Sequence, residues 1–112
     1  ILSSGAQMSR MFNGASSFNG DISSWDISNS DGNLASMFKN ANSFNQDIGG
    51  WDVSNISNVE SMFEGATQFN QDIGPWRINI SNGNNMRKMF YNLNVTYPFI
   101  RYNIFFYQIN VT

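Results

Sequence analysis

The apolar residues of this chain recur in a pattern that repeats about every 25 residues. Each repeat begins with apolar side chains at i, i+3, i+4 and i+7, the spacing of one helical face. In one repeat these residues are Val59, Met62, Phe63 and Ala66. The same spacing recurs at 8–15 and 34–41. Ser57, followed three residues later by Glu60, has the pattern of a capping box. The spacing therefore predicts a short helix at the start of each repeat.

The second half of each repeat has a different period. Trp51 and Val53 flank Asp52, so apolar and polar positions alternate as on a β-strand with one buried face. This alternation predicts a strand of about three to five residues in each repeat, separated from the helical turns by a corner on either side. A single repeat of this kind could not bury its own aromatic residues, so we expect successive repeats to stack.

The repeat is explicit in the sequence itself. Met-Phe pairs occur at 11–12, 37–38, 62–63 and 89–90, and the residues that follow share the order Phe, Asn, Asp-Ile and Trp. The fourth copy loses this order after its Met-Phe pair. We therefore expect residues 1–90 to form about three and a half repeats of 25–27 residues. Residues 91–112 are expected to form a degenerate repeat with a β-prone C-terminal tail. We expect an α/β repeat fold: a short solenoid with a parallel ladder of strands and short helical turns.

The shared pattern M-F-x-G/N-A-x-x-F-N-Q-D-I-x-x-W-D-V-S-N resembles the repeat of BspA-like surface proteins, a leucine-rich-repeat-like family. The resemblance covers roughly residues 8–90 and departs from the pattern at Gly20, at Arg77 and throughout 91–112. It implies a leucine-rich-repeat-like solenoid displayed on the cell surface and used in adhesion. It implies no catalytic residues.

The composition excludes several classes of function. The chain has no histidine and no cysteine, which removes disulfides, thiol or histidine catalysis and Cys/His metal sites. We therefore expect no enzyme and no cofactor. The six basic residues cluster nowhere beyond a local group near residue 87, so they provide no nucleic-acid surface. The longest apolar stretch, at 97–107, is interrupted by Arg101 and Asn103 and is too short to span a membrane.

Repetition would place equivalent polar residues in columns. Asp21, Asp47 and Asp72 form the first such column, for which two interpretations exist. The carboxylates could hold a cation such as Ca²⁺, or each could accept backbone N–H groups at a tight corner. We favour the second interpretation, because no further acidic residue of the repeat lies nearby. The column therefore predicts no metal site.

A second set of polar residues occupies the outward position of the expected strand. It consists of Asp26, Asp52 and Arg77, and it is a candidate ligand face in which Asp52 and Arg77 would pair. The aromatic columns Trp25, Trp51, Trp76 and Phe18, Phe44, Phe69 are expected to be buried, although an exposed tryptophan ladder would instead suit glycan stacking. Stacked asparagine side chains would bridge successive repeats.

Four Asn-x-Ser/Thr sequons, at Asn55, Asn79, Asn94 and Asn110, are candidate N-glycosylation sites. The chain opens Ile1-Leu2-Ser3 without a signal pattern, so we expect a mature or partial chain. The leading hypothesis is an extracellular or cell-surface module that recognises a protein or a glycan in adhesion. The alternative is a structural subunit that self-associates head to tail into a fibre or larger assembly, with 91–112 capping its own chain or a neighbour.

Overall fold

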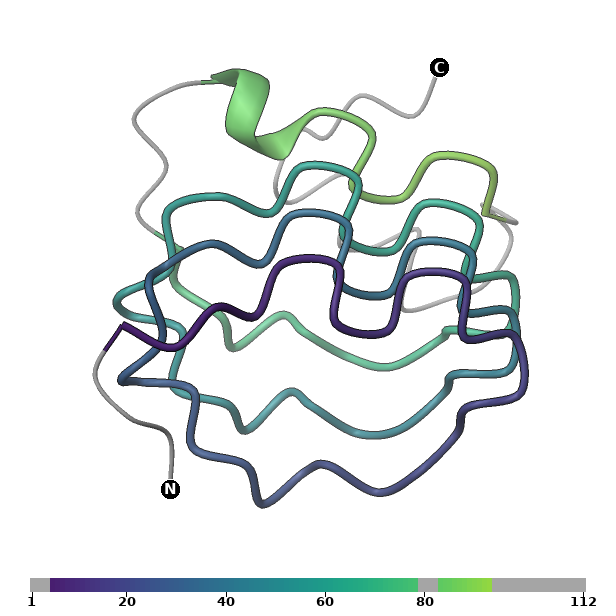
Figure 1. The fold of residues 1–112 in the computed structure, drawn as a ribbon, viewed down its shortest axis with the longest axis horizontal. Coiled ribbons are helices and arrows are strands. Elements are labelled where there is room, and N and C mark those ends of the chain that lie inside the picture. The colour runs from purple at the N-terminus through teal and green to yellow at the C-terminus, as the bar shows by residue number, and fades with distance from the viewer. Residues whose placement is uncertain (1–4, 79–82, 94–112) are drawn as a thin grey trace.

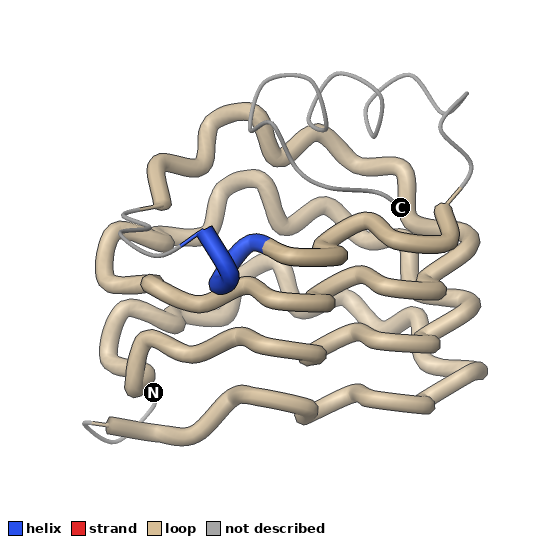
Figure 2. The backbone as a smooth tube through the Cα atoms, turned by 90° about the horizontal axis from the view of Figure 1, so that it is seen from above, coloured by secondary structure: helices blue, strands red, loops and turns tan. Residues whose placement is uncertain are grey.

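The computed structural model describes residues 5–78 and 83–93. Within these residues the one regular element is the 3₁₀-helix η1 (Gly83–Met86). Two isolated parallel bridges, Ala6 with Ser30 and Asn33 with Asn58, join neighbouring repeats. The expected α/β solenoid, with its strand ladder and its short helices, is therefore wrong: the described chain is a compact fold made mostly of turns and loops, without a sheet (Figures 1 and 2).

The segments 8–15, 34–41 and 59–66, which were expected to be helical, are runs of consecutive turns, here called turn runs. Residues 86–93 form a fourth turn run. In the run 34–41, Met37 N donates to Leu34 O at 3.2 Å and Ala41 N donates to Phe38 O at 3.0 Å, so each bond closes a four-residue turn. The third residue of each of these turns, Ser36 and Asn40, has a positive φ of 56° and 59°. This left-handed backbone fits a tight turn and stops a helix from propagating.

All four turn runs repeat this geometry. The positive φ recurs at the matching positions, which are Arg10 and Gly14, Ser36 and Asn40, Ser61 and Gly65, and Lys88 and Asn92. Because every second N–H of a run is used inside a turn, the N–H groups between them point away from it. Phe38 N, for example, donates to Met62 O of the next repeat at 2.9 Å, and Phe63 N donates to Met89 O at 2.9 Å. Figure 1 shows the corrugated turn runs lying side by side as a result.

The expected strands are also absent from residues 5–78. Trp51 N closes a turn on Ile48 O at 3.1 Å, and Ile56 N closes another on Val53 O at 2.9 Å. Between these turns the Asp52 carboxylate accepts the N–H of Ser54, which is a side-chain interaction local to one repeat. The chain therefore bends where an extended strand was expected, because side chains and turns satisfy its backbone groups.

The core consists of aromatic rings stacked from one repeat to the next. Phe12, Phe38, Phe63 and Phe90 form one column, with ring centroids 5.5–5.7 Å apart. Phe18, Phe44 and Phe69 form the second, with centroids 5.9 Å apart. Within each repeat, the phenylalanine ring of one column stacks on that of the other, with centroids 4.1 Å apart. Burial of these rings supplies the hydrophobic stabilisation that regular secondary structure usually organises.

Most of the expected C-terminal tail lies outside the described residues. Of the segment 91–112, only 91–93 is described. Its role as a cap or an association segment therefore stays a prediction. Leu93, at the end of the described chain, is buried.

Candidate functional site

The three aspartates of the first column each bind the backbone of their own repeat. Oδ1 of Asp21, Asp47 and Asp72 accepts the N–H two residues further on, at 2.9, 3.0 and 2.8 Å. Asp21 also accepts the Ser23 hydroxyl at 2.6 Å. That hydroxyl, and then the Ser23 N–H, hold the pKa of the Asp21 carboxyl below its usual value. All three residues are exposed, so each aspartate keeps acceptor capacity toward solvent.

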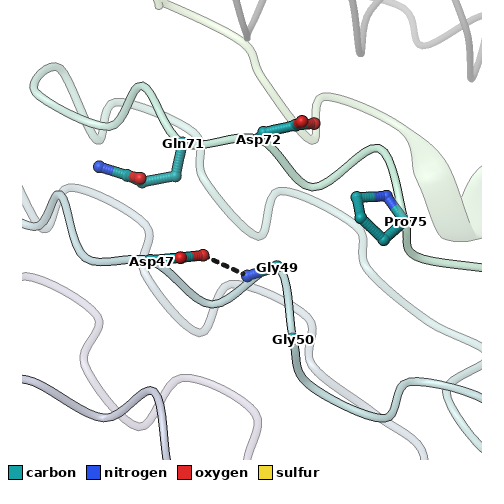
Figure 3. A pocket seen from close by; sticks show the side chains of 6 residues that line it. All are labelled: Asp47, Gly49, Gly50, Gln71, Asp72 and Pro75. Atoms are coloured by element: carbon teal, nitrogen blue, oxygen red, sulfur yellow. Dashed lines mark hydrogen bonds between the residues drawn. The ribbon is translucent and has the colours of Figure 1, made fainter.

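Two of these aspartates border a hollow on the side of the molecule. The hollow has a volume of about 530 Å³ and lies between the second and third repeats. Its lining residues, drawn in Figure 3, are Asp47, Gly49, Gly50, Gln71, Asp72 and Pro75. The Gln71 amide is held in place because its Nε2 donates to Asn45 O at 3.2 Å and to Asn45 Oδ1 at 3.0 Å. The hollow is thus an open site bordered by two carboxylates and one anchored amide.

The sequence did not predict this hollow. Gly49 and Pro75 carry no chemistry that would mark them as site residues, and they come from different repeats. The hollow forms only when the repeats stack. The one signal in the sequence was the recurrence of glycine after the Asp-Ile pair, at Gly49 and Gly74.

The candidate ligand face does not form as a charge-paired row. The Oδ1 atoms of Asp26 and Asp52 accept the N–H and the hydroxyl of Ser28 and Ser54, which lower the pKa of both aspartates. Arg77 Nη1 donates to its own repeat, to Gly74 O at 2.9 Å and to Trp76 O at 3.1 Å. The expected pairing of Asp52 with Arg77 is absent from the described part of the chain.

A different ion pair joins the second and third repeats. Lys39 Nζ lies 3.9 Å from Glu64 Oε1, and both side chains retain some exposure. Partly exposed pairs of this kind contribute little to stability. Neither residue is among the candidate site residues predicted from the sequence.

The tryptophans occupy two environments. Trp51 and Trp76 are buried and stacked, with centroids 6.4 Å apart and ring planes 6° apart. Their indole N–H groups donate to Ile22 O and Ile48 O of the preceding repeat, each at 3.0 Å. Trp25 is 37% exposed, and its ring centroid lies 5.9 Å from that of Phe12. The prediction of one buried column of three tryptophans is therefore wrong for Trp25, which lies at the end of the stack.

Asparagine side chains connect the repeats, as expected. Asn45 N donates to Asn19 Oδ1 at 2.8 Å, and Asn70 N donates to Asn45 Oδ1 at 2.9 Å. Among the described residues, no donor reaches the buried Oδ1 atom of Asn70, which lies at the end of this ladder. The Oδ1 atoms of Asn19 and Asn45 therefore support the backbone of the following repeat.

One of the four sequons can be placed. The Asn55 side chain is exposed at the surface, and its Nδ2 donates to Ser30 O at 3.2 Å and to Ser30 Oγ at 3.4 Å. A glycan attached to this nitrogen would compete with a contact between repeats. Asn79, Asn94 and Asn110 lie outside the described residues.

Residues 5–78 and 83–93 contain no group of three acidic side chains arranged to hold a metal ion. No helix in the same residues has the length and apolar character needed to cross a membrane.

Comparison with known proteins identifies a family but no relative of known structure. A family described as "Mycoplasma protein of unknown function" (DUF285) matches residues 2–99. No BspA-like family matches, so the resemblance to BspA-like and leucine-rich-repeat-like proteins is wrong. No curated protein and no solved structure matches the chain.

Proposed function

The chain belongs to this family of Mycoplasma proteins of unknown function, and we propose that it is a non-enzymatic recognition module. In this proposal it works outside the cell or on the cell surface and binds a protein or glycan ligand in adhesion. The observation that carries the proposal is the hollow lined by Asp47, Asp72 and Pro75. The absence of histidine and cysteine from the sequence supports a binding role over catalysis.

The chemistry of the hollow suits a ligand with many hydrogen-bond donors. A carboxylate is an acceptor with about four lone-pair sites, and the Gly49 and Gly74 N–H groups each occupy one of them on Asp47 and Asp72. The remaining sites are open to sugar hydroxyls or to a basic side chain of a protein ligand. Pro75 adds an apolar surface beside them. Few polar groups around an apolar surface are typical of small-ligand sites.

Hydrogen bonds that anchor the walls of the hollow also support recognition. The Asp-x-Gly turns and the Gln71 amide are bonded within the protein and stand beside the stacked aromatic core, so the walls are formed before a ligand arrives. A preformed site loses less conformational entropy on binding than a flexible one. The proposal therefore needs no conformational change in the lining residues.

The replacement Asp72→Asn is expected to weaken ligand binding about tenfold or more, since it removes a charged acceptor. The Asn Oδ1 atom can still accept the Gly74 N–H, so the turn is preserved. The measurement is binding of the labelled protein to a glycan array and to immobilised extracellular-matrix proteins. Asp21→Asn, at the equivalent corner but outside the hollow, is the matched control and should bind like the wild type.

Two results would contradict the proposal. The wild type could bind neither the array nor the matrix proteins. Alternatively, the two asparagine variants could bind equally well. The second candidate function is end-to-end self-association. It is supported by unpaired backbone acceptors in the first repeat of the described chain, which are treated below.

A further inference from the structure

Contacts between repeats follow one rule on the side of the turn runs. Three alternate N–H groups of a run donate to three alternate C=O groups of the next repeat. From the first run to the second, the donors Arg10, Phe12 and Gly14 bond to the carbonyls of Ala35, Met37 and Lys39 at 2.8–3.0 Å. From the third run to the fourth, the donors Ser61, Phe63 and Gly65 bond to the carbonyls of Arg87, Met89 and Tyr91 at 2.9 Å.

This rule leaves a row of acceptors at the N-terminal end. Ser9, Met11 and Asn13 hold the positions of Ala35, Met37 and Lys39 one repeat earlier. Among the described residues no N–H group donates to the carbonyls of these three. Every later repeat uses the same carbonyls. The first repeat therefore presents a backbone edge that matches the donors of a turn run.

Apolar side chains beside this edge are also uncovered. Met11 is 44% exposed and Trp25 is 37% exposed, and these are the large hydrophobic residues that stand out on the described surface. Phe12 and Phe18 are only partly buried, whereas the equivalent rings of the second repeat are fully buried. The N-terminal end thus combines open acceptors with aromatic surface that one more repeat would cover.

The last described turn run offers the complementary donors. Lys88, Phe90 and Asn92 hold the positions of Ser61, Phe63 and Gly65, and their N–H groups have no acceptor within residues 5–78 and 83–93. The φ angles of Lys88 and Asn92, 57° and 65°, match those of Ser61 and Gly65, 56° and 72°. The donors of the fourth run therefore have the geometry that the earlier runs use to bind the next repeat.

We propose that a second copy of this chain docks head to tail on the N-terminal end and continues the contact that joins the repeats. In this contact Lys88 N–H of one copy donates to the Ser9 carbonyl of the next. Phe90 N–H pairs with the Met11 carbonyl, and Asn92 N–H pairs with the Asn13 carbonyl. The rings of Phe90 and Phe12 then extend the first phenylalanine column across the two copies.

The backbone acceptors at one end and donors at the other favour a head-to-tail contact over a face-to-face contact. Two N-terminal ends face to face would oppose acceptors to acceptors, so they could form none of these backbone bonds. A head-to-tail contact uses different surfaces on its two sides, and it therefore grows into a filament or closes into a ring. The Phe90 ring is fully buried in the single chain, so docking must exchange its present cover for Phe12. We therefore expect association that is slow and depends on concentration.

Sedimentation velocity of the full chain, from dilute to concentrated solution, tests the docking. The average mass of the wild type should rise steadily with concentration. Met11→Glu places a charge on the exposed N-terminal end and should remain monomeric. Gln68→Glu adds the same charge at an exposed position in the third repeat, away from both ends, and should associate like the wild type. The fluorescence of buried Trp51 checks that both variants are folded.

A mixing experiment identifies the head-to-tail geometry. The Met11→Glu chain keeps its donor end, so adding it to the wild type should cap growing assemblies and lower their mass, while Gln68→Glu should not. A wild type that is monomeric at every concentration would overturn the proposal. A Met11→Glu chain that associates like the wild type would also overturn it. So would wild-type assemblies whose mass stays the same when the Met11→Glu chain is added. Because these readouts need no ligand, the proposal can fail while binding at the hollow stands.

Discussion

Trp51→Ala is expected to lower the free energy of unfolding by about 3–5 kcal/mol. The ring is buried between neighbouring repeats, stacks on Trp76 and is tilted against Phe38 at 6.4 Å. Its removal leaves a cavity among aromatic rings that are fixed by their own columns and cannot easily collapse into it. It also removes the bond from the indole N–H to Ile22 O. Urea unfolding followed by circular dichroism measures the change.

Trp25→Ala is the matched control, since Trp25 holds the same repeat position at the end of the stack. Its ring is 37% exposed and no indole bond to another described residue holds it. The expected loss is about 1 kcal/mol or less. Equal losses in the two variants would show that the interior stacking of Trp51 contributes nothing special.

Gly49→Ala is expected to destabilise the fold by about 1–3 kcal/mol, the range of an overpacked site. A Cβ atom at this position would collide with the backbone carbonyl oxygen of Asp72 in the next repeat and lie 3.3 Å from Asp47 Oδ1. Backbone atoms cannot rotate away as a side chain can, so the two repeats must separate locally. Thermal unfolding of the purified variant measures the effect.

Gly50→Ala provides the control one residue away. A Cβ atom at Gly50 has nothing within 4 Å, and the backbone there is not left-handed. We expect a change within about 0.5 kcal/mol, or a slight stabilisation from the less flexible unfolded chain. A Gly49 variant as stable as the Gly50 variant would contradict the close approach of the second and third repeats.

The sequence predicted the stacking of the phenylalanine rings but not the backbone that achieves it. Two tight turns in succession place apolar side chains at i, i+3, i+4 and i+7, so their spacing is the same as that of a helical face. The difference lies in the φ angles of residues such as Ser36 and Arg10, which are left-handed at 56° and 60°. Neither serine nor arginine favours that conformation by itself. The same angle recurs in all four turn runs, including at Lys88 in the last one, so it is a property of the turn run and not of the residue type.

The expected strands failed for a related reason. The alternation of Trp51, Asp52 and Val53 correctly marks two inward side chains and one outward side chain. However, the aspartate accepts the N–H of Ser54 and bends the chain, where a strand would leave that N–H for a neighbouring strand. The frequent Asp-x-Ser and Asp-x-Gly sequences were the available signal for these turns.

The candidate site could be predicted only where it is local. The binding of Asp21, Asp47 and Asp72 to nearby backbone depends on residues two positions away, and the sequence contains that information. The hollow depends on the distance between repeats, and the exposure of Trp25 depends on its place at the end of the stack. Both properties arise from the assembly of repeats, which the pattern of one repeat does not specify.

Hydrogen exchange of single amides tests most directly whether backbone bonds between repeats hold this fold together. The N–H groups of Phe38 and Phe63 donate to the next repeat and are expected to exchange only when the whole chain unfolds. The N–H of Ser43, which donates to no other described residue, should exchange much faster. Exchange of the Phe38 and Phe63 amides at the rate of the Ser43 amide would contradict the account.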